Sequence, residues 1–494
     1  MNVTMLLDMA ADGFGDRVVT GGRRDGVTAS RLWELSIGGA RLIKQAGADA
    51  VVYLAVNGPA FSAALFAAAR ADVPLVPVNY RLGKEQLAQL LGRHPHALAI
   101  AEPEYKEVLQ KGGPPARTPS EWLALAGDEQ VDEPEPAEFE SPAVIIYTSG
   151  TTSAPKGAVL RHENLVSYVL ATVEFAGADA EQAALMSVPP YHIAAVSNVL
   201  TNLFAGRRVI SLESFTPEGW LELVREERVS NAMVVPTMLA RIMHGTGLNR
   251  SVPSLRSLAY GGSKMPPRVI EAALREWPHV EFVNAYGLTE TSSTIAVLGP
   301  KEHREAIASE VPAVRARLGS VGRPIPGVDI EIRDDEALVG TGDSGQIWVS
   351  GEQVSGEYLD GKAMVDSRGF FDTRDLGHLD SEGYLFIEGR VDDTIIRGAE
   401  NIAPAEIEDV LLRHPDVIDT VVVGVPDEEW GQRIEAVVVA RTGAELDVVE
   451  LREHVRGALR GSKTPDRIVC WPELPRTATG KVVRREVVAG LAAD

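Results

Sequence analysis

Short apolar runs alternate with helical patterns along the first 290 residues of the chain. Buried-strand patterns at 51–56 (VVYLAV) and 73–78 (VPLVPV) are each followed by a stretch with helical periodicity, at 60–71 and 85–93. Such an alternation predicts β-α-β units and a mostly parallel sheet. The strand pattern returns at 97–102, 143–149, 233–237, 257–262 and 281–287. Several of these strands end in Gly, Ser, Thr or Asn, and ligand sites in such sheets lie at the carboxyl ends of strands.

The pattern changes twice in the second half of the chain. From Gly322, β segments separated by Gly and Asp, such as 328–340 and 344–351, predict a small antiparallel or barrel-like unit. After Arg390, a helix, two strands, a second helix and a basic tail predict a separate α+β unit; the patterns lie at 404–415, 420–426, 433–441 and 447–459.

The predicted fold class is α/β. We expect a large N-terminal domain of layered α/β subdomains with the small barrel-like part, at residues 1–391, and a small mobile α+β C-terminal domain at 392–494. The acidic, Pro-containing segment 127–142 is expected to be a loop or linker.

Composition limits the classes of function. The 494 residues are 45% apolar, which is enough for large cores, and about 150 residues per domain suggests about three compact units. The formal charge of −22 excludes general binding to nucleic acid or anionic membrane, which needs a basic face. One cysteine excludes a disulfide framework and a multi-thiolate metal site. We find no signal-peptide pattern and no integral membrane segment, so we expect a cytoplasmic protein.

The strongest chemical signal is YTSGTTSAPKGAV at 147–159, where a buried strand runs into six consecutive Gly, Ser or Thr residues. Small residues let the backbone approach a phosphate, hydroxyl and N–H groups donate to its oxygens, and a lysine adds a positive charge. The Walker A pattern is not matched. The sequence therefore predicts a phosphate-binding loop of a different type, with Thr148, Ser149, Gly150, Thr151, Thr152 and Lys156 as its binding residues.

This loop resembles the phosphate loop of the adenylate-forming superfamily, which includes acyl- and aryl-CoA synthetases, luciferases and peptide-synthetase adenylation domains. Further motifs of that superfamily appear in the same order: PPYHIAA (189–195), YGGSKMP (260–266), NAYGLTET (284–291), the segment 370–393, RGAENIAPAEIE (397–408) and PRTATGK (475–481). The resemblance runs from about residue 143 to 482. Three residues, Ser153, Arg374 and Ala399, stand where the superfamily usually has Gly.

The resemblance implies a site for ATP and Mg²⁺. Glu290 and Thr151 would bind the ion, as hard oxygen ligands suit Mg²⁺, and Asp375 with Arg390 would bind the ribose. Tyr286 would stack on the adenine. The adenine and acyl sites would be lined by Gly261, Gly262, Ser263, Asn284, Tyr286, Gly287 and Thr289.

Two residues are assigned to catalysis by the resemblance. Lys481 would bridge the substrate carboxylate and the phosphate during adenylation, and His192 would close the acyl tunnel rather than act as a nucleophile. The context of Lys481 also resembles sites of acetylation by a lysine acetyltransferase, which would remove its charge. Asp392 matches the hinge position about which the C-terminal domain turns. Gly398, Glu400 and Asn401 match the loop that then faces coenzyme A.

The predicted reaction has two halves. A small-molecule carboxylic acid attacks ATP to give acyl-AMP and pyrophosphate, and coenzyme A then takes the acyl group and releases AMP. We expect an acyl-CoA synthetase for a medium- or long-chain fatty acid. Two alternatives stay open: an aryl- or acyl-AMP ligase that loads a carrier protein, and a catalytically weakened nucleotide-binding protein, which the three departures from Gly would favour. A homodimer is also left open.

Overall fold

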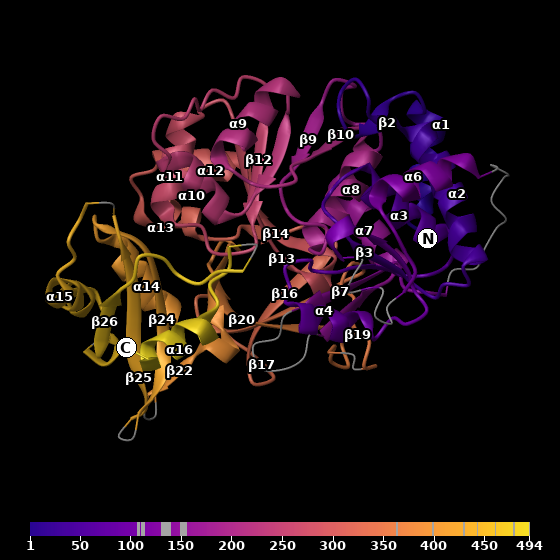
Figure 1. Ribbon diagram of the computed structural model, residues 1–494. Coiled ribbons are helices and arrows are strands. Elements are labelled where there is room, and N and C mark those ends of the chain that lie inside the picture. Colours follow the sequence, from indigo (N-terminus) through magenta and orange to yellow (C-terminus); the bar gives the residue numbers. More distant parts are fainter. Residues whose placement is uncertain are drawn as a thin grey trace.

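The computed structural model describes residues 1–105, 109, 114–129, 140–148, 156–361, 364–397, 400–427, 430–441, 443–459, 461–477 and 480–493. Figure 1 shows a large body that runs from the indigo N-terminus to the orange strands, and a smaller gold body of C-terminal residues at one end. The larger body contains three sheets and the smaller body two. The expected α/β class with a large and a small domain is confirmed.

The first sheet carries the phosphate-loop strand. Its order is β19-β8-β7-β4-β3-β5-β6, with β7, β4, β3, β5 and β6 parallel and β8 and β19 antiparallel to their neighbours. The strands are β3 (Val51–Leu54), β4 (Leu75–Pro77), β5 (Leu98–Ala101), β6 (Ala116–Arg117), β7 (Val144–Thr148), β8 (Lys156–Leu160) and β19 (Glu357–Tyr358). The helices of this region are α3 (Pro59–Arg70), α4 (Lys84–Leu91), the 3-10 turn η1 (Pro103–Tyr105), α6 (Pro119–Asp128) and α7 (His162–Thr172).

The second sheet has nine strands in the order β15-β14-β13-β12-β11-β9-β10-β1-β2, and its six central strands from β13 to β1 are parallel. The strands are β1 (Val18–Thr20), β2 (Val27–Thr28), β9 (Ala183–Met186), β10 (Arg208–Ser211), β11 (Asn231–Val234), β12 (Ser257–Gly261), β13 (Glu281–Leu288), β14 (Ser293–Leu298) and β15 (Arg323–Pro324). Its helices and turns are α1 (Thr4–Phe14), α2 (Ala29–Gln45), α8 (Ile193–Ala205), α9 (Pro217–Glu226), α10 (Pro236–His244), α11 (Pro267–Glu276), η2 (Thr289–Thr291), α12 (Pro300–Ala308), α13 (Pro312–Ala316) and η3 (Arg317–Gly319).

The unit expected from Gly322 onwards is an antiparallel sheet of five strands, in the order β17-β16-β18-β20-β21. Its strands are β16 (Val328–Asp334), β17 (Ala337–Leu338), β18 (Gly345–Gly351), β20 (Phe371–Leu379) and β21 (Leu385–Arg390). Alternate residues of β20 are buried, as expected for a strand with one face on a core.

The smaller body follows the 3-10 turn η4 (Val391–Asp393). It combines a hairpin of β22 (Ile395–Arg397) and β23 (Glu400–Ile402) with a sheet of β24 (Val417–Asp427), β25 (Gly431–Ala440) and β26 (Arg467–Cys470). Its helices are α14 (Pro404–Arg413), α15 (Val448–Ala458), η5 (Gly461–Lys463) and α16 (Arg484–Ala493). The segment expected to be a basic tail thus forms strand β26 and helix α16.

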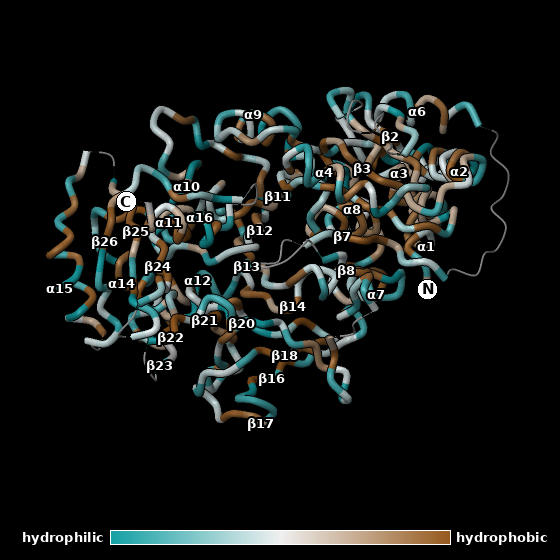
Figure 2. Tube along the Cα trace, turned by 60° about the horizontal axis from the view of Figure 1, so that its bottom comes forward, coloured by the Kyte–Doolittle hydropathy of each residue, from teal (hydrophilic) through white to brown (hydrophobic). Residues whose placement is uncertain are grey.

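One hydrophobic core joins the sheets of the larger body, because residues of all three sheets, such as Tyr53, Leu185 and Ile347, belong to a single buried cluster. The smaller body has two clusters of its own, on opposite faces of its sheet. Figure 2 shows the apolar segments in brown on interior elements such as β3, α3 and α8, with teal on outer turns. Among the described helices, none has the length and apolarity needed to cross a membrane.

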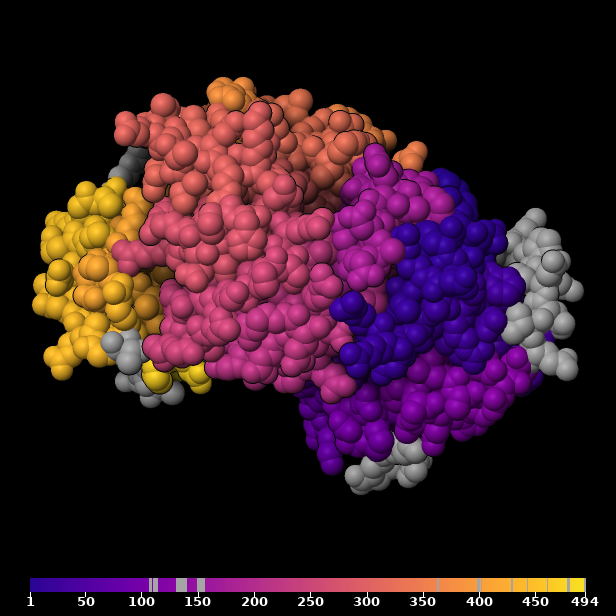
Figure 3. Space-filling model, turned by 90° about the horizontal axis from the view of Figure 1, so that it is seen from above, coloured from indigo at the N-terminus to yellow at the C-terminus, as the bar shows by residue number. Residues whose placement is uncertain are grey.

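The two bodies meet along α10 and α11. Lys264, before α11, lies 2.6 Å from the Asp409 carboxylate of α14, and Arg268 donates to the Pro415 carbonyl oxygen at 3.2 Å. Figure 3 shows the gold body against the rose-coloured residues of this region, at the end of the molecule away from the indigo N-terminus. Residues from both bodies can therefore form one site.

Candidate active site

The residues predicted to bind ribose lie together where β20 pairs with β21. Asp375 faces Arg390 in the antiparallel register, and its Oδ1 lies 3.2 Å from the Arg390 Nε. The Tyr286 hydroxyl, from the end of β13, donates to Asp375 Oδ2 at 2.6 Å. Burial raises the pKa of Asp375, although the charge of Arg390 and the Tyr286 hydroxyl oppose that shift. The result is a buried acceptor with an arginine and a phenol beside it.

Two glycines allow the strands around this group to approach closely. A Cβ on Gly261 would lie 2.2 Å from the Ala285 carbonyl oxygen, and one on Gly287 would lie 1.6 Å from the Ser293 carbonyl oxygen. Gly262 has φ of +84°, a conformation that glycine adopts at little cost. Ser263 follows in the same turn, and Asn284 donates to the Ser320 carbonyl oxygen at 3.0 Å. This hydrogen bond ties β13 to the segment that follows η3.

Glu290, the predicted metal ligand, lies in η2 beside Thr289 and is buried. The Tyr358 hydroxyl of β19 donates to its Oε1 at 2.6 Å. The same phenol ring lies 5.7 Å from the Lys156 ammonium nitrogen at the start of β8. Desolvation, followed by the Glu290 charge, raises the pKa of Tyr358, which keeps its proton on the oxygen. Tyr358 thus links the predicted metal ligand to the predicted phosphate-binding lysine.

The phosphate loop is anchored by strand pairing at both ends, because Thr148 of β7 faces Lys156 of β8. The Thr148 hydroxyl lies 3.4 Å from the Lys156 carbonyl oxygen. The other predicted loop residues, Ser149, Gly150, Thr151 and Thr152, together with Ser153, lie outside the described residues.

Lys481 comes from the smaller body and reaches the residues of the larger one. Its pKa is lowered, first by desolvation and then by the Arg390 charge, while Asp393 and Asp375 oppose that shift. Lys481 is exposed when the whole residue is considered. Its pKa depends on the ammonium group alone, on which the charges of Arg390, Asp393 and Asp375 act. Gly480 has φ of +80°, and a Cβ there would lie 2.2 Å from the Thr237 hydroxyl of α10. This close contact seats the lysine loop on the larger body.

His192 precedes α8, and its low pKa makes it a weak base at neutral pH. Burial, helped by the Arg81 charge, lowers its pKa to about 4, so the imidazole is neutral. Its ring centroid lies 4.7 Å from that of Tyr191. Within the described part of the chain, His192 Nε2 and Tyr191 Oη are buried without a hydrogen-bond partner. Both facts agree with a residue that borders a pocket.

A cavity of about 400 Å³ lies between the two bodies, next to the Lys481 loop. Pro189 from the predicted acyl segment and Thr237 of α10 line one part of it, and Gly480 and Thr477 line another. Its charged lining residues are Arg81, Arg241, Arg476 and Glu213. Arg476 is already paired with Asp419 at 2.5 Å. Arg81 and Arg241 therefore face the single carboxylate of Glu213, which leaves a positive charge that suits an anionic group.

The predicted hinge and the predicted coenzyme A loop follow strand β21 in the chain. Asp392 is part of η4, between strand β21 and the hairpin of β22 and β23. The hairpin that contains Glu400 packs on β25, with the Ile396 backbone N–H donating to Gln432 Oε1 at 2.6 Å. Gly398, Ala399 and the side chain of Asn401 lie outside the described residues. Lys481 of the smaller body acts on Asp375 through its charge.

Sequence reasoning missed three contributors. Tyr358 follows no recognisable motif, and only the pairing of β19 with β8 brings it to Glu290. Arg81 and Arg241 belong to segments more than 100 residues apart and were not singled out. A search for arginines that follow apolar strand patterns would have found Arg81, because it comes four residues after β4. Arg241 had no such signal.

Comparison with known proteins agrees with this geometry. The family model described as AMP-binding enzyme matches residues 7–359, and the AMP-binding enzyme C-terminal domain matches residues 406–481. A feruloyl-CoA synthase from Amycolatopsis sp. is 34% identical over 478 residues, covering 94% of each chain. A fatty acid–[acyl-carrier-protein] ligase from Streptomyces coeruleorubidus is 32% identical, covering 91% of this chain and 88% of that protein.

A solved structure shows the same arrangement. The o-succinylbenzoate CoA synthetase from Bacillus subtilis, in complex with its acyl-adenylate intermediate, has a TM-score of 0.84 and 26% identity, covering 98% of this chain and 97% of that one. The family match begins at residue 7, well before the first motif recognised in the sequence. The chain therefore belongs to the AMP-binding enzymes of the adenylate-forming superfamily.

Proposed function

We propose that the protein activates a carboxylic acid with ATP to form acyl-AMP and pyrophosphate, and then transfers the acyl group to coenzyme A with release of AMP. One observation carries this proposal: the turn at Gly480 packs closely against Thr237 of α10, so that the charge of Lys481 on the smaller body acts on Asp375 and Arg390 of the larger body. Family membership and the relatives support the same reaction.

In the first half-reaction, a carboxylate oxygen attacks the α-phosphorus, and the bond between that phosphorus and the oxygen bridging to the β-phosphate breaks. Lys481 would sit between the two anions and reduce their repulsion. Asp375, Arg390 and Tyr286 would fix the ribose, which positions the α-phosphate for attack. Lys156 and the loop that begins at Thr148 would hold the phosphates that leave.

The donors around Glu290 fit a magnesium ion. They are a carboxylate and nearby hydroxyl groups, which are hard oxygen ligands. The described residues hold no cluster of three or more His, Cys, Asp or Glu that could bind a metal alone, so phosphate oxygens would complete the ligand set. Glu290, held by Tyr358, and Thr151 would bind the ion. When bound, Mg²⁺ would neutralise part of the phosphate charge.

In the second half-reaction, the sulfur of coenzyme A attacks the acyl carbonyl carbon and AMP leaves. The thiol proton must be lost, and coenzyme A brings several phosphates to the site. Arg81 and Arg241 line the cavity beside the lysine loop and could hold those phosphates. We propose this cavity as the approach of the acceptor.

The acid is proposed to carry a bulky apolar tail. The sequence favours a medium- or long-chain fatty acid, whereas the relatives include enzymes named for a feruloyl substrate and for fatty acids. Two polar residues of α8 follow His192 in the chain: the Ser197 hydroxyl bonds to Ser293 at 3.2 Å, and Asn198 Oδ1 is buried without a partner among the described residues. An unpaired buried acceptor of this kind would favour one hydroxyl or N–H donor on an otherwise apolar tail.

The test is product formation with a panel of acids: ferulate, indoleacetate, 2-succinylbenzoate, decanoate and palmitate. Each is incubated with ATP, Mg²⁺ and coenzyme A, and acyl-CoA and AMP are quantified. Acyl-CoA in an amount equal to AMP supports the proposal. AMP release without acyl-CoA, restored by a carrier protein, would favour the carrier-loading alternative, and no turnover with any acid would favour a weakened nucleotide-binding protein.

Four features stay predictions: the boundary between residues 391 and 392, the mobility of the C-terminal domain, a homodimer and acetylation of Lys481. Acetylation would remove the Lys481 charge that acts on Asp375, so we expect it to stop the first half-reaction.

A further inference from the structure

We propose that Arg374 is a positioning residue that holds the hinge turn η4 in the arrangement used for adenylation, through an ion pair with Asp392. This inference rests on the proposed function, because it assumes that the smaller body turns between the two half-reactions. Asp392 takes part as an anchor, and Arg374 acts through it without contact to the substrate.

The backbone of Arg374 is the first observation. Its φ is +61°, in the left-handed region that favours glycine, and its N–H donates to Asp372 Oδ1 at 2.8 Å. Glycine would adopt this turn more readily, and the resembling family usually has glycine here. An arginine at this strained position is explained by a contact that glycine cannot make.

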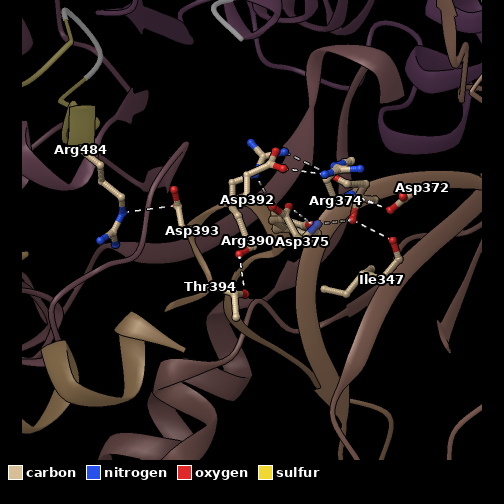
Figure 4. Close-up of polar contacts among 11 residues, drawn as sticks. Ile347, Asp372, Arg374, Asp375, Arg390, Asp392, Asp393, Thr394 and Arg484 are labelled. Carbon is tan, nitrogen blue, oxygen red and sulfur yellow. Dashed lines mark hydrogen bonds and ion pairs between the residues drawn. The ribbon is translucent and has the colours of Figure 1, made fainter. Parts of the chain in front are cut away.

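That contact is the ion pair with the hinge turn. Arg374 Nη2 of β20 lies 2.5 Å from Asp392 Oδ1 of η4. Figure 4 shows the two side chains pointing toward each other, with Asp375 and Arg390 beneath them. The side chains of Arg374 and Asp392 are 42% and 41% exposed, so water and salt screen the pair.

The next carboxylate is held from the opposite side. Asp393 lies 3.3 Å from Arg484 Nε of helix α16, and Arg484 also contacts Glu408 of α14 at 2.7 Å. Figure 4 shows Asp393 directed toward Arg484, away from Arg374. Two consecutive aspartates therefore connect η4 to the larger body through Arg374 and to the smaller body through Arg484.

A turn about Asp392 would affect these two pairs differently. Asp393 and Arg484 can move together with the smaller body, whereas Arg374 stays with β20, so its pair with Asp392 must lengthen or break. Arg374 also directly precedes Asp375, the proposed ribose ligand. The ion pair of Arg374 with Asp392, called the clamp below, therefore lies next to the proposed nucleotide site. A half-exposed pair of this kind corresponds to a shift of about two- to fivefold in the ratio of the two arrangements.

The first test compares the two half-reactions in Arg374→Asn and Arg374→Lys. Asparagine tolerates the left-handed backbone and removes the charge, whereas lysine keeps the charge and is the matched control. ATP–pyrophosphate exchange reports the first half, and single-turnover transfer from preformed acyl-AMP to coenzyme A reports the second. In Arg374→Asn we expect the ratio of transfer to exchange to rise about two- to fivefold, and in Arg374→Lys to stay near that of the unaltered protein.

Two further readouts separate a clamp from a merely structural arginine. Raising the salt from about 0.05 M to about 0.5 M should reduce the difference between the protein and its Asn variant, because the pair is screened. Arg374→Asn and Asp392→Asn should also be non-additive, so that the double variant changes the ratio no more than Arg374→Asn alone. Additive effects that do not respond to salt would overturn the proposal.

A distance measurement tests the arrangement without any acid. Cys470 is the single cysteine of the chain, lies in the smaller body and is exposed, so it takes one spin label. Leu170→Cys on α7, 44% exposed, takes the other. Pulsed EPR on the protein alone and with AMP plus coenzyme A should show a second distance whose share grows about two- to fivefold in Arg374→Asn.

Unchanged distance distributions in Arg374→Asn would overturn the clamp. This outcome is distinct from failure of the proposed function, which would appear as an absence of exchange with every acid in the unaltered protein. A changed distance distribution without any exchange would support the clamp and reject the activity.

Discussion

At the scale of single residues, the site depends on side chains whose ionisation is set by their neighbours. The Tyr286 hydroxyl donates a hydrogen bond to the Asp375 carboxylate at 2.6 Å, and burial raises the pKa of both groups. Lys481 shows the opposite shift, since desolvation lowers its pKa. The ribose residues could be proposed from their motif, but the proximity of Lys481, which follows in the sequence about 100 residues later, depends on how the two bodies dock.

The lowered pKa of Lys481 predicts the pH dependence of adenylation. The ammonium form is the one that can hold two anions, and it is lost as the pH rises through a pKa below the ordinary value of 10.5. We expect kcat/KM for ATP–pyrophosphate exchange to fall on the alkaline side below pH 10.5, and Lys481→Arg to move that fall to higher pH if it retains activity. An alkaline limb that is identical in both proteins would assign the ionisation to another group.

Tyr358 offers a second test at this scale. Tyr358→Phe removes the hydroxyl that donates to Glu290 but keeps the ring beside Lys156. Because hydrogen bonds to a carboxylate contribute about 1.5–3 kcal/mol, we expect the Mg²⁺ concentration for half-maximal exchange to rise by about tenfold or more. Tyr384→Phe, in the same body, is the control. A Tyr358→Phe protein with an unchanged Mg²⁺ requirement would remove Tyr358 from the metal site.

Buried histidines predict the stability of the protein in mild acid. Burial lowers the pKa of His162 and His303 from 6.5 to about 4. His303 accepts from the Tyr260 hydroxyl at 2.8 Å and donates to the Gly299 carbonyl oxygen at 2.7 Å, which fits the neutral ring. The unfolded chain takes up protons below pH 6.5 and the folded one does so only near pH 4, so stability is full above 6.5 and falls as the pH drops.

The expected loss is on the order of 3 kcal/mol of unfolding free energy per histidine across that interval. Urea unfolding at pH 7.5 and pH 5 measures the part of this loss that occurs above pH 5, about 2 kcal/mol per histidine. His303→Gln should flatten the dependence, while His96→Gln, at an exposed position, should leave it as it is. An unchanged slope in His303→Gln would show that other groups cause the acid sensitivity.

At the scale of elements, the predicted runs 143–149 and 257–262 match β7 and β12 within a few residues, because they are continuous and end in turn residues. The central strands β9 and β10 of the nine-stranded sheet were not predicted. The helix pattern at 404–415 likewise became α14. The pairing of β19 with β8 was not predictable, since β19 has only two residues and lies about 200 positions further along the chain. Short edge strands carry too little pattern, yet this one delivers Tyr358 to the site.

The cavity between α10 and the Lys481 loop gives a prediction for the elements that form it. Arg81 follows β4 on the larger body and should contribute to binding of coenzyme A but not to adenylation. We expect Arg81→Ala to raise KM for coenzyme A about tenfold, as for loss of one charge-assisted contact. ATP–pyrophosphate exchange should change little.

Arg93→Ala is a suitable control for the loss of one surface charge, because Arg93 stacks on Tyr147 away from the cavity lining. Equal effects of Arg81→Ala on exchange and on transfer would show that the cavity does not receive the acceptor.

At the scale of the whole molecule, the division into a large and a small body was predictable from the change of pattern after Arg390. The path of the first 28 residues was not: β1 and β2 join the far edge of the nine-stranded sheet, next to β10, although almost 200 residues separate them in sequence. Strand order in a sheet this large is fixed by which apolar faces the helices leave exposed, and local periodicity does not contain that information. The net charge of −22 is likewise a property of the whole chain. At the boundary between the bodies, Arg81, Arg241 and Lys481 supply local positive charge.

The central claim is that Lys481, presented by the smaller body, completes an adenylation site on the larger one. The most direct measurement is ATP–pyrophosphate exchange with the best acid of the panel, in the unaltered protein, in Lys481→Ala and in the control Lys301→Ala, whose side chain is 82% exposed on α12. We predict that Lys481→Ala loses exchange by at least about 100-fold, as for removal of a group that stabilises transition-state charge, while Lys301→Ala retains it. Full exchange in Lys481→Ala would contradict the account.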